Sequence, residues 1–281
     1  SRGIDLDGLR GSGPDGAVVA ADVNERAAAM RQATETATGV TGTSAASRHA
    51  APSAATPRQR SPESMRRLIA ERMSKANREI PHYRLVRDVD VSTLQHWLSE
   101  TNAQRPIAER ILPAAAYVRA VALAAARHPE LNGFWREDAF QSGDGVHVAM
   151  AISLRRGGLV TPHVADADRA SIDQIMDRLR ELVAAARAGT LKSSWMTGST
   201  ITLTNLGDTG ADLVHGVISP PQVALVGMGR VTDRPWVADG ELVVRPVLTV
   251  TLAADHRATD GAIGSRFLST LAHALEHPEE L

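Results

Sequence analysis

The residues best suited to chemistry lie in one short stretch of the sequence, Val247 to Gly261. Its first seven residues are mostly β-branched or small on both faces, as in a strand that is covered on both sides. His256 follows just past the end of this strand, and Asp260 and Gly261 come four and five residues after the histidine. A polar turn between rigid elements can hold a reactive imidazole in fixed geometry while a substrate still reaches it.

The element that must position this turn on its other side is a helix, because apolar residues recur at roughly helical spacing after Gly261. These residues are Ile263, Phe267, Leu268, Leu271 and Leu275. The predicted layout is therefore strand, polar turn, helix. The local pattern leaves two plainer interpretations open: His256 could only cap the helix, or it could be a satisfied core histidine.

The segment Asp255 to Gly261, DHRATDG, resembles the HxxxDG motif of the dihydrolipoamide acyltransferases, the core subunits of 2-oxo acid dehydrogenase complexes. Residues 65–91 resemble the start of the family's catalytic domain, and Ser219 to Gln222 stand at its NPPQ-like turn. The resemblance covers about Pro62 to Leu281. It implies an α/β fold with a two-layer mixed sheet and helices, like that of chloramphenicol acetyltransferase and other CoA-dependent acyltransferases.

The same resemblance assigns roles to four residues. His256 is expected to be the general base, and Thr204, at the end of a strand predicted in Gly198 to Gly207, to donate a hydrogen bond to the reaction's oxyanion. The plainer interpretation of that strand is that its threonines only line an exposed face. Asn205 is a candidate contact for coenzyme A, and Asp260 is expected to fix local structure through an ion pair.

In this family the acyl group passes between coenzyme A and a dihydrolipoamide that is carried on a lipoyl domain, which this chain lacks. A thiol with a pKa of ~8.5 and an imidazole with one of ~6.5 differ by about two units, or roughly 2.7 kcal/mol, so one neutral histidine suffices as base. A single hydroxyl donor is worth about 3 to 4 kcal/mol at the oxyanion. Neither a metal nor a covalent enzyme intermediate is required.

Family members place the histidine and the hydroxyl on neighbouring subunits, so the resemblance implies a homotrimer. A larger cage is less expected, because the sequence ends in HPEEL without the apolar tail that joins many trimers. Two other functions stay open: an enzyme of the same fold that acts on a free small acceptor, and a non-catalytic scaffold. The retained His256 and Asp260 disfavour the scaffold.

Composition limits the possible partners. At 281 residues and 43% hydrophobic, the chain can bury one large core with something small beside it. With 31 basic and 32 acidic residues it has no charge excess that favours nucleic acid. No apolar run approaches the ~20 residues of a membrane span, and no secretory signal is visible. The absence of cysteine excludes disulfides and thiolate metal sites and is compatible with the reducing cytoplasm, where we expect the protein.

Three regions are predicted along the chain. Residues 1–26 resemble the second half of a peripheral subunit-binding domain, the module that docks the decarboxylase and dihydrolipoamide dehydrogenase subunits, and its first helix is missing. Residues 27–61 are rich in Ala, Thr, Ser, Pro and Arg and predict a flexible linker. Residues 62–281 form the predicted catalytic domain.

Within the catalytic domain, helices and strands are expected to alternate irregularly. Helices are predicted from Ser61 to about Arg78, over Ser92 to Asn102 and Leu112 to Arg127, and through Ile172 to Val183. Strands are predicted after Pro81 and over Val146 to Ser153, Leu159 to Val164 and Val223 to Gly229. The basic residues of the first helix form a solvated face, or one or two of them meet coenzyme A phosphates or Asp260. His82 is interpreted as structural.

Overall fold

The computed structural model describes residues 62–154 and 158–281, which lie within the second of the two units of the chain, Gln59–Leu281. The predicted docking module (1–26) and the predicted linker (27–61) lie outside the described residues. None of the helices in the described part is both long and apolar enough to cross a membrane.

Five α-helices lie in the described part of the chain, and short 3-10 turns separate some of the elements. The helices are α2 (Pro62–Glu79), α3 (Ser92–Ala103), α4 (Pro113–Arg127), α5 (Ile172–Ala188) and α6 (Gly261–Glu276). Their ends follow from local sequence. At the start of α5, the Ser171 side chain accepts from the N–H of Gln174 while the Gln174 side chain accepts from the N–H of Ser171. Gly189 ends the same helix with φ of 72°.

The main sheet has six strands in the order β1-β10-β9-β8-β4-β7. The described strands are β1 (His82–Asp90), β2 (Gly133–Arg136), β3 (Ala139–Ser142), β4 (Val148–Met150), β5 (Ile152–Ser153), β6 (Leu159–Val160), β7 (His163–Val164), β8 (Ile201–Asn205), β9 (Ala224–Ala238) and β10 (Glu241–Asp255). Strand β8 runs parallel to β4 and β9, and the other pairs are antiparallel. The predicted mixed sheet is therefore confirmed.

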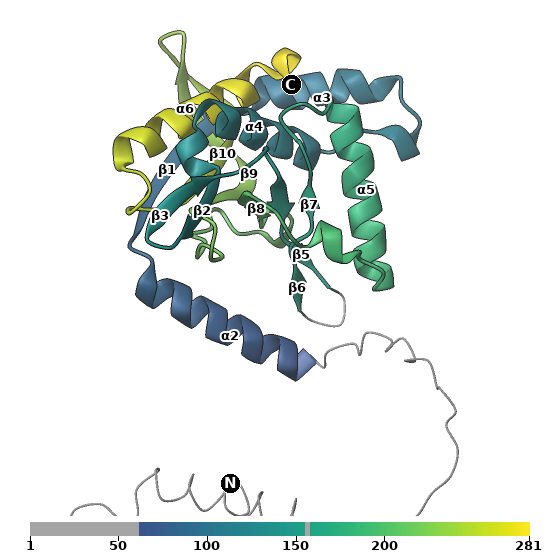
Figure 1. Cartoon of the computed structure of the whole chain (residues 1–281). Helices are drawn as coiled ribbons and strands as arrows, with labels where there is room; N and C mark the ends of the chain where they lie inside the picture. The colour runs from purple at the N-terminus through teal and green to yellow at the C-terminus, as the bar shows by residue number, and fades with distance from the viewer. Residues whose placement is uncertain (1–61, 155–157) are drawn as a thin grey trace, which may run out of the picture. The chain divides into compact units, whose positions relative to one another are not determined.

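The core lies between the sheet and the helices α3, α4 and α6, which gather on one side of it (Figure 1). Helix α4 carries alanine at most of its buried positions, which lets it approach the sheet and α6 closely. On the opposite face of β10, Ala253 packs with Ala76 and Ile80 at the end of α2 and with Ile218. The part of β10 from Val247 to Ala253 is thus covered on both faces, as its sequence predicts.

Two predicted strands are each divided in the structure. Residues 146–153 form β4 and β5, and residues 159–164 form β6 and β7. Pro162 separates β6 from β7, because proline has no N–H to donate to a neighbouring strand. Its carbonyl accepts a hydrogen bond from the main-chain N–H of Met150. Strands β5 and β6 therefore pair with each other outside the main sheet.

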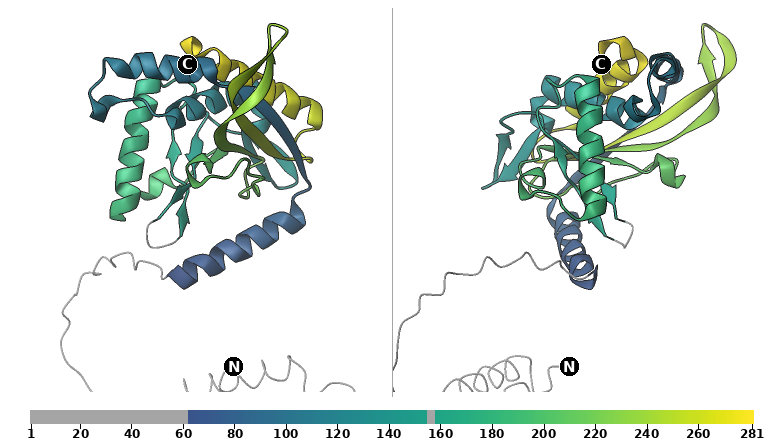
Figure 2. Two further views of the ribbon diagram at one scale, coloured as in Figure 1. Left: turned by 180° about the vertical axis from the view of Figure 1, so that it is seen from behind. Right: turned by 90° about the vertical axis from the view of Figure 1, so that its right-hand side faces the viewer.

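Strands β9 and β10 are longer than predicted and form a hairpin that reaches beyond the rest of the domain (Figure 2). Its turn is Asp239-Gly240, and both residues have positive φ, of 53° and 83°. Asp-Gly is a sequence that favours such a two-residue turn. The sequence therefore carried the signal for this hairpin, although the strand prediction stopped at Gly229.

Candidate active site

His256 is the first residue past β10, as predicted. Its main-chain N–H donates to the carbonyl of Pro81 at 3.0 Å, which ties the turn to the start of β1. The imidazole is exposed and contacts the ring of Tyr83 edge to face, with 5.3 Å between centroids. No hydrogen bond of either ring nitrogen is recorded within residues 62–154 and 158–281. His256 is therefore neither a core histidine nor the cap of α6, and its ring is accessible to a substrate.

The ring of Tyr83 forms a fixed surface beneath His256. Its hydroxyl lies 2.8 Å from the hydroxyl of the buried Thr259, three residues after His256. Burial raises the pKa of Tyr83, so the phenol stays neutral at physiological pH. The contact joins β1 to the turn that precedes α6.

Asp260 caps α6. Its Oδ1 accepts from the backbone N–H groups of Ala262 and Ile263, each at 2.9 Å. The pKa of Asp260 is lowered, chiefly by the hydrogen bond from Ile263 and then by that from Ala262 and by the nearby Arg266 and His256. Asp260 thus fixes local structure, but by capping a helix; an ion pair of this carboxylate, which we expected, is not recorded within the described residues.

Thr204 and Asn205 are the last residues of β8, as predicted, and both are half-buried. The Asn205 side chain accepts from the N–H of Gly207 at 2.9 Å and so turns the chain out of the sheet. No hydrogen bond of the Thr204 hydroxyl is recorded in the part of the chain that the structure describes. The earlier threonines of this segment, Thr200 and Thr202, are buried rather than on an exposed face.

The surroundings of Thr204 are tightly packed on one side. Its partner in β9 is Gly227, where a Cβ would lie 2.5 Å from the hydroxyl of Thr251 and 2.6 Å from the carbonyl of Val214. Thr251 also donates to that carbonyl at 2.5 Å. Glycine at 227 therefore lets the segment around Val214 lie close over the sheet beside Thr204.

Thr204 and His256 do not meet within one chain. Across the sheet, Thr204 pairs with Gly227 and Gly227 pairs with Thr251, five residues before His256. Thr204 and His256 are thus separated by two strand spacings across the sheet and by five residues along a strand, which together correspond to about 19 Å. A hydrogen-bonded intermediate needs both groups within a few ångströms of the same reacting atoms, so one chain cannot assemble such a site alone.

Two adjoining pockets open beside the end of β8. One, of about 530 Å³, lies between α5 and strands β4 and β5, and the other, of about 450 Å³, borders Gly229 and Arg230. Leu112, Ala114 and Asn205 line both. The first pocket is mainly apolar and has two arginines in its lining, Arg180 and Arg187. The strand end that carries Thr204 and Asn205 therefore stands where two cavities meet.

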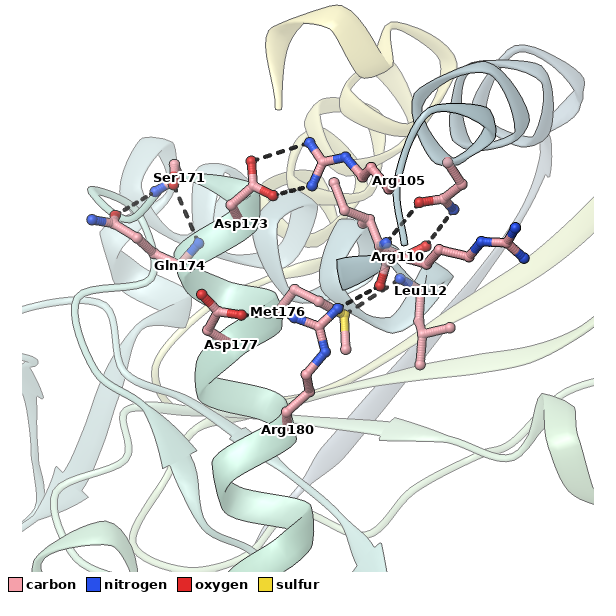
Figure 3. Close-up of polar contacts among 11 residues, drawn as sticks. Arg105, Arg110, Leu112, Ser171, Asp173, Gln174, Met176, Asp177 and Arg180 are labelled. Atoms are coloured by element: carbon pink, nitrogen blue, oxygen red, sulfur yellow. Dashed lines mark hydrogen bonds and ion pairs between the residues drawn. The ribbon is translucent and has the colours of Figure 1, made fainter. Parts of the chain in front are cut away.

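The segment before α4 is fastened to α5 at the edge of the first pocket (Figure 3). Arg105 pairs with Asp173 near the start of α5. Arg180 donates to the carbonyl of Arg110 at 2.6 Å and to Asp177 at 2.7 Å. The pocket is therefore lined by fixed rather than loosely placed elements.

Sequence reasoning missed the two residues that flank His256. Asp255 is fully buried, and its carboxylate pairs with Arg257, with 2.6 Å between Oδ2 and Nη2. The guanidinium of Arg257 also lies over the ring of Trp135 in β2, 4.9 Å from its centroid. A charged residue on each side of His256, in the motif DHR, was the available signal.

His82 is structural, as predicted: its Nδ1 lies 2.9 Å from the carbonyl of Ile80 and its Nε2 accepts from the N–H of Ile218. Among the described residues, no group of three or more His, Cys, Asp or Glu side chains is arranged to hold a metal ion.

Comparison with known proteins places this arrangement in context. Residues 55–281 match the family model of the 2-oxoacid dehydrogenases acyltransferase catalytic domain. The chain is 34% identical to the dihydrolipoyllysine-residue acetyltransferase component of the pyruvate dehydrogenase complex of Staphylococcus aureus (strain COL), over 100% of this chain and 67% of that protein. The corresponding protein of Staphylococcus epidermidis is 32% identical over 99% of this chain and 67% of its own length.

Solved structures agree with these sequence matches. A probable dihydrolipoamide acetyltransferase from Listeria monocytogenes superposes with a TM-score of 0.72 at 28% identity, over 81% of this chain and 96% of that one. A chloramphenicol acetyltransferase shares the fold, with a TM-score of 0.50 at 16% identity over 73% of this chain and 94% of that one. The mixed sheet with a histidine at a strand end is thus the acyltransferase fold that the sequence predicts.

The chain is an acyltransferase by fold. It belongs to the 2-oxo acid dehydrogenase acyltransferase family, because the family model covers most of the chain and a relative above 30% identity matches it throughout.

Proposed function

We propose that this chain transfers an acyl group between coenzyme A and a dihydrolipoyl group carried on a lipoyl domain, as the core subunit of a 2-oxo acid dehydrogenase complex in the cytoplasm. The observation that carries the proposal is the exposed imidazole of His256, whose ring nitrogens are free of recorded partners within the described residues, in a chain of this family. The names of the Staphylococcus relatives, acetyltransferase components of pyruvate dehydrogenase, support an acetyl group as the one transferred.

In the proposed reaction, His256 takes the proton of the incoming thiol, and the thiolate attacks the thioester carbonyl carbon. A carbon–sulfur bond forms as the carbonyl oxygen becomes an oxyanion, which the Thr204 hydroxyl stabilises. The oxyanion then re-forms the carbonyl, the original carbon–sulfur bond breaks, and the imidazolium returns its proton to the departing thiolate. Asn205, in the lining of both pockets, contacts coenzyme A.

The separation of about 19 Å between Thr204 and His256 supports a site shared between chains. We infer a homotrimer in which each site takes its histidine from one protomer and its hydroxyl from the next. The decarboxylase and dihydrolipoamide dehydrogenase subunits are the proposed further partners of the assembly.

Residue spacing gives this assignment additional support. The dihydrolipoamide acetyltransferase of Azotobacter vinelandii, which shares the fold at 23% identity, was investigated for the role of a serine, a histidine and an asparagine in its catalytic mechanism. The serine and histidine there are 52 residues apart, and the histidine and asparagine 4. Thr204, His256 and Asp260 have the same two spacings.

Thioester exchange between dihydrolipoamide and several acyl-CoAs tests the proposal. His256→Ala should lower kcat by orders of magnitude while the oligomer stays intact, and Thr204→Ala should lower it by about 10² to 10³ with little change in KM for coenzyme A. His96→Ala, an exposed histidine on α3, is the matched control and should keep full activity. Wild-type turnover in His256→Ala would refute the mechanism.

The same assay separates the other two functions. An enzyme that acts on a free small acceptor would leave dihydrolipoamide unacylated while consuming acyl-CoA with another acceptor. A scaffold would turn over neither.

A further inference from the structure

Asp255 is a buried charge, with an exposed fraction of 0%. Within residues 62–154 and 158–281, all the hydrogen bonds to its carboxylate come from Arg257. Oδ1 accepts from the main-chain N–H of Arg257 at 3.0 Å and from Nε at 2.9 Å, and Oδ2 accepts from Nη2 at 2.6 Å. This is the two-pronged geometry in which a guanidinium holds a carboxylate most firmly.

The turn that carries His256 is wound around this pair. The N–H of Asp255 donates to the carbonyl of Val223, and its carbonyl accepts from the N–H groups of Ala258 and Thr259 at 3.0 and 3.1 Å. His256 lies between the two charged residues and bonds by its own N–H to Pro81. The main chain on both sides of the imidazole is therefore fixed by Asp255 and Arg257.

A third element holds Arg257 from the far side. The ring of Trp135 lies beneath the guanidinium, and the main-chain N–H of Trp135 donates to the carbonyl of Pro221 at 2.8 Å. The next residue, Gln222, accepts from Thr202 of β8 at 2.5 Å. The β2–β3 hairpin thus connects the turn of His256 to the strand that ends in Thr204.

We propose that Arg257, locked between Asp255 and Trp135, is a positioning residue that holds His256 in its reactive orientation. The inference rests on the proposed function, in which His256 is the base. Arg257 itself touches no substrate in this scheme; it acts through the backbone on each side of the imidazole.

The consequence of losing Arg257 follows from the burial of its partner. Without the guanidinium, Asp255 would be left buried and unpaired, so the turn must open to hydrate the carboxylate. A displacement of about 1 Å at a catalytic group costs up to about 100-fold in rate. Arg257→Gln should therefore lower kcat by about 10- to 100-fold per assembled site, with both KM values within about threefold of wild type.

Three variants probe the same pair by different routes. Arg257→Lys keeps the charge without the two-pronged fork and should show an intermediate kcat. The double variant Asp255→Asn with Arg257→Gln removes the buried charge and should recover at least about threefold over Arg257→Gln alone. Trp135→Leu leaves the ion pair but removes its support and should lower kcat less than Arg257→Gln.

The assay measures kcat and KM on protein whose assembled mass is verified by light scattering, so that loss of folding is not counted as loss of rate. Arg127→Gln is the control, because Arg127 is an exposed arginine at the last position of α4, about 20 Å along the helix from Ala114 at the pockets. In a His256→Ala background, Arg257→Gln should have no further effect, since there is no base left to position.

Two outcomes would overturn the positioning role. One is a kcat per assembled site in Arg257→Gln that lies within about twofold of wild type. If Arg257→Gln does not assemble, the same result in both Arg257→Lys and the double variant overturns the role. The other is an equal further loss in the His256→Ala background. Failure of the proposed function is a separate result, because it requires wild-type turnover in His256→Ala alone.

Discussion

Complementation between two inactive variants provides the sharpest test of the shared site. His256→Ala removes the base from a chain and leaves its Thr204; Thr204→Ala does the reverse. In one chain the two groups are about 19 Å apart, which no side-chain rotation can close, so the proposed site, which uses both, takes them from two chains. A cyclic trimer that contains both variants always has one interface where an intact histidine faces an intact threonine.

The expected magnitude follows from this symmetry. Doubly tagged trimers, purified through one tag on each variant, should show about one third of wild-type turnover, and an unselected equal mixture about one quarter. Each variant alone should retain at most about 1%. Mixing the two proteins after separate assembly, under conditions without subunit exchange, is the control and should give only the average of the single variants. The same low average in the doubly tagged trimers would show that both groups act within one chain.

Two further predictions concern groups near the site and in the core. Asp260→Ala should lower Tm by about 3 °C, because the cap of α6 is lost. Asp260→Asn can still cap the helix and should keep both the Tm and the activity of the wild type. Equal Tm values for the two variants would contradict the capping role. His163 is 8% exposed, and its pKa is lowered from 6.5, chiefly by burial and then by His147. Because the unfolded chain then binds more protons than the folded chain, the free energy of unfolding should fall as pH drops below about 6.5. His163→Leu should flatten the dependence of Tm on pH, whereas the control variant His96→Ala should leave it unchanged.

The sequence predicted the elements whose signals are local. The apolar stripe located α5, and the β-branched run before His256 located β10, because helix spacing and strand burial depend on residues that are close in sequence. The divided strands were missed for a related reason. Pro162 was a visible interruption, but only the structure gives the two separate pairings that result.

The site was predicted as a set of residues and not as a geometry. His256, Thr204 and Asn205 stand at strand ends as expected, yet their separation depends on the order β10-β9-β8, which no local pattern contains. Arg257 was overlooked because its partners are a buried neighbour in sequence and a ring 122 residues away, at Trp135. Long-range contacts of this kind are identified only from the folded structure.

The interruption at Pro162 has a consequence for how this enzyme can change. The small β5–β6 ribbon contributes Ile152 and Ser153 to the wall of the larger cavity but shares no ladder with the six-stranded sheet. Replacements at those two positions can reshape the chamber beside Asn205 without breaking a hydrogen bond of the central scaffold. Because Asn205 is the proposed contact for coenzyme A, such replacements can change how the proposed site fits its substrate while the fold and the turn of His256 are preserved.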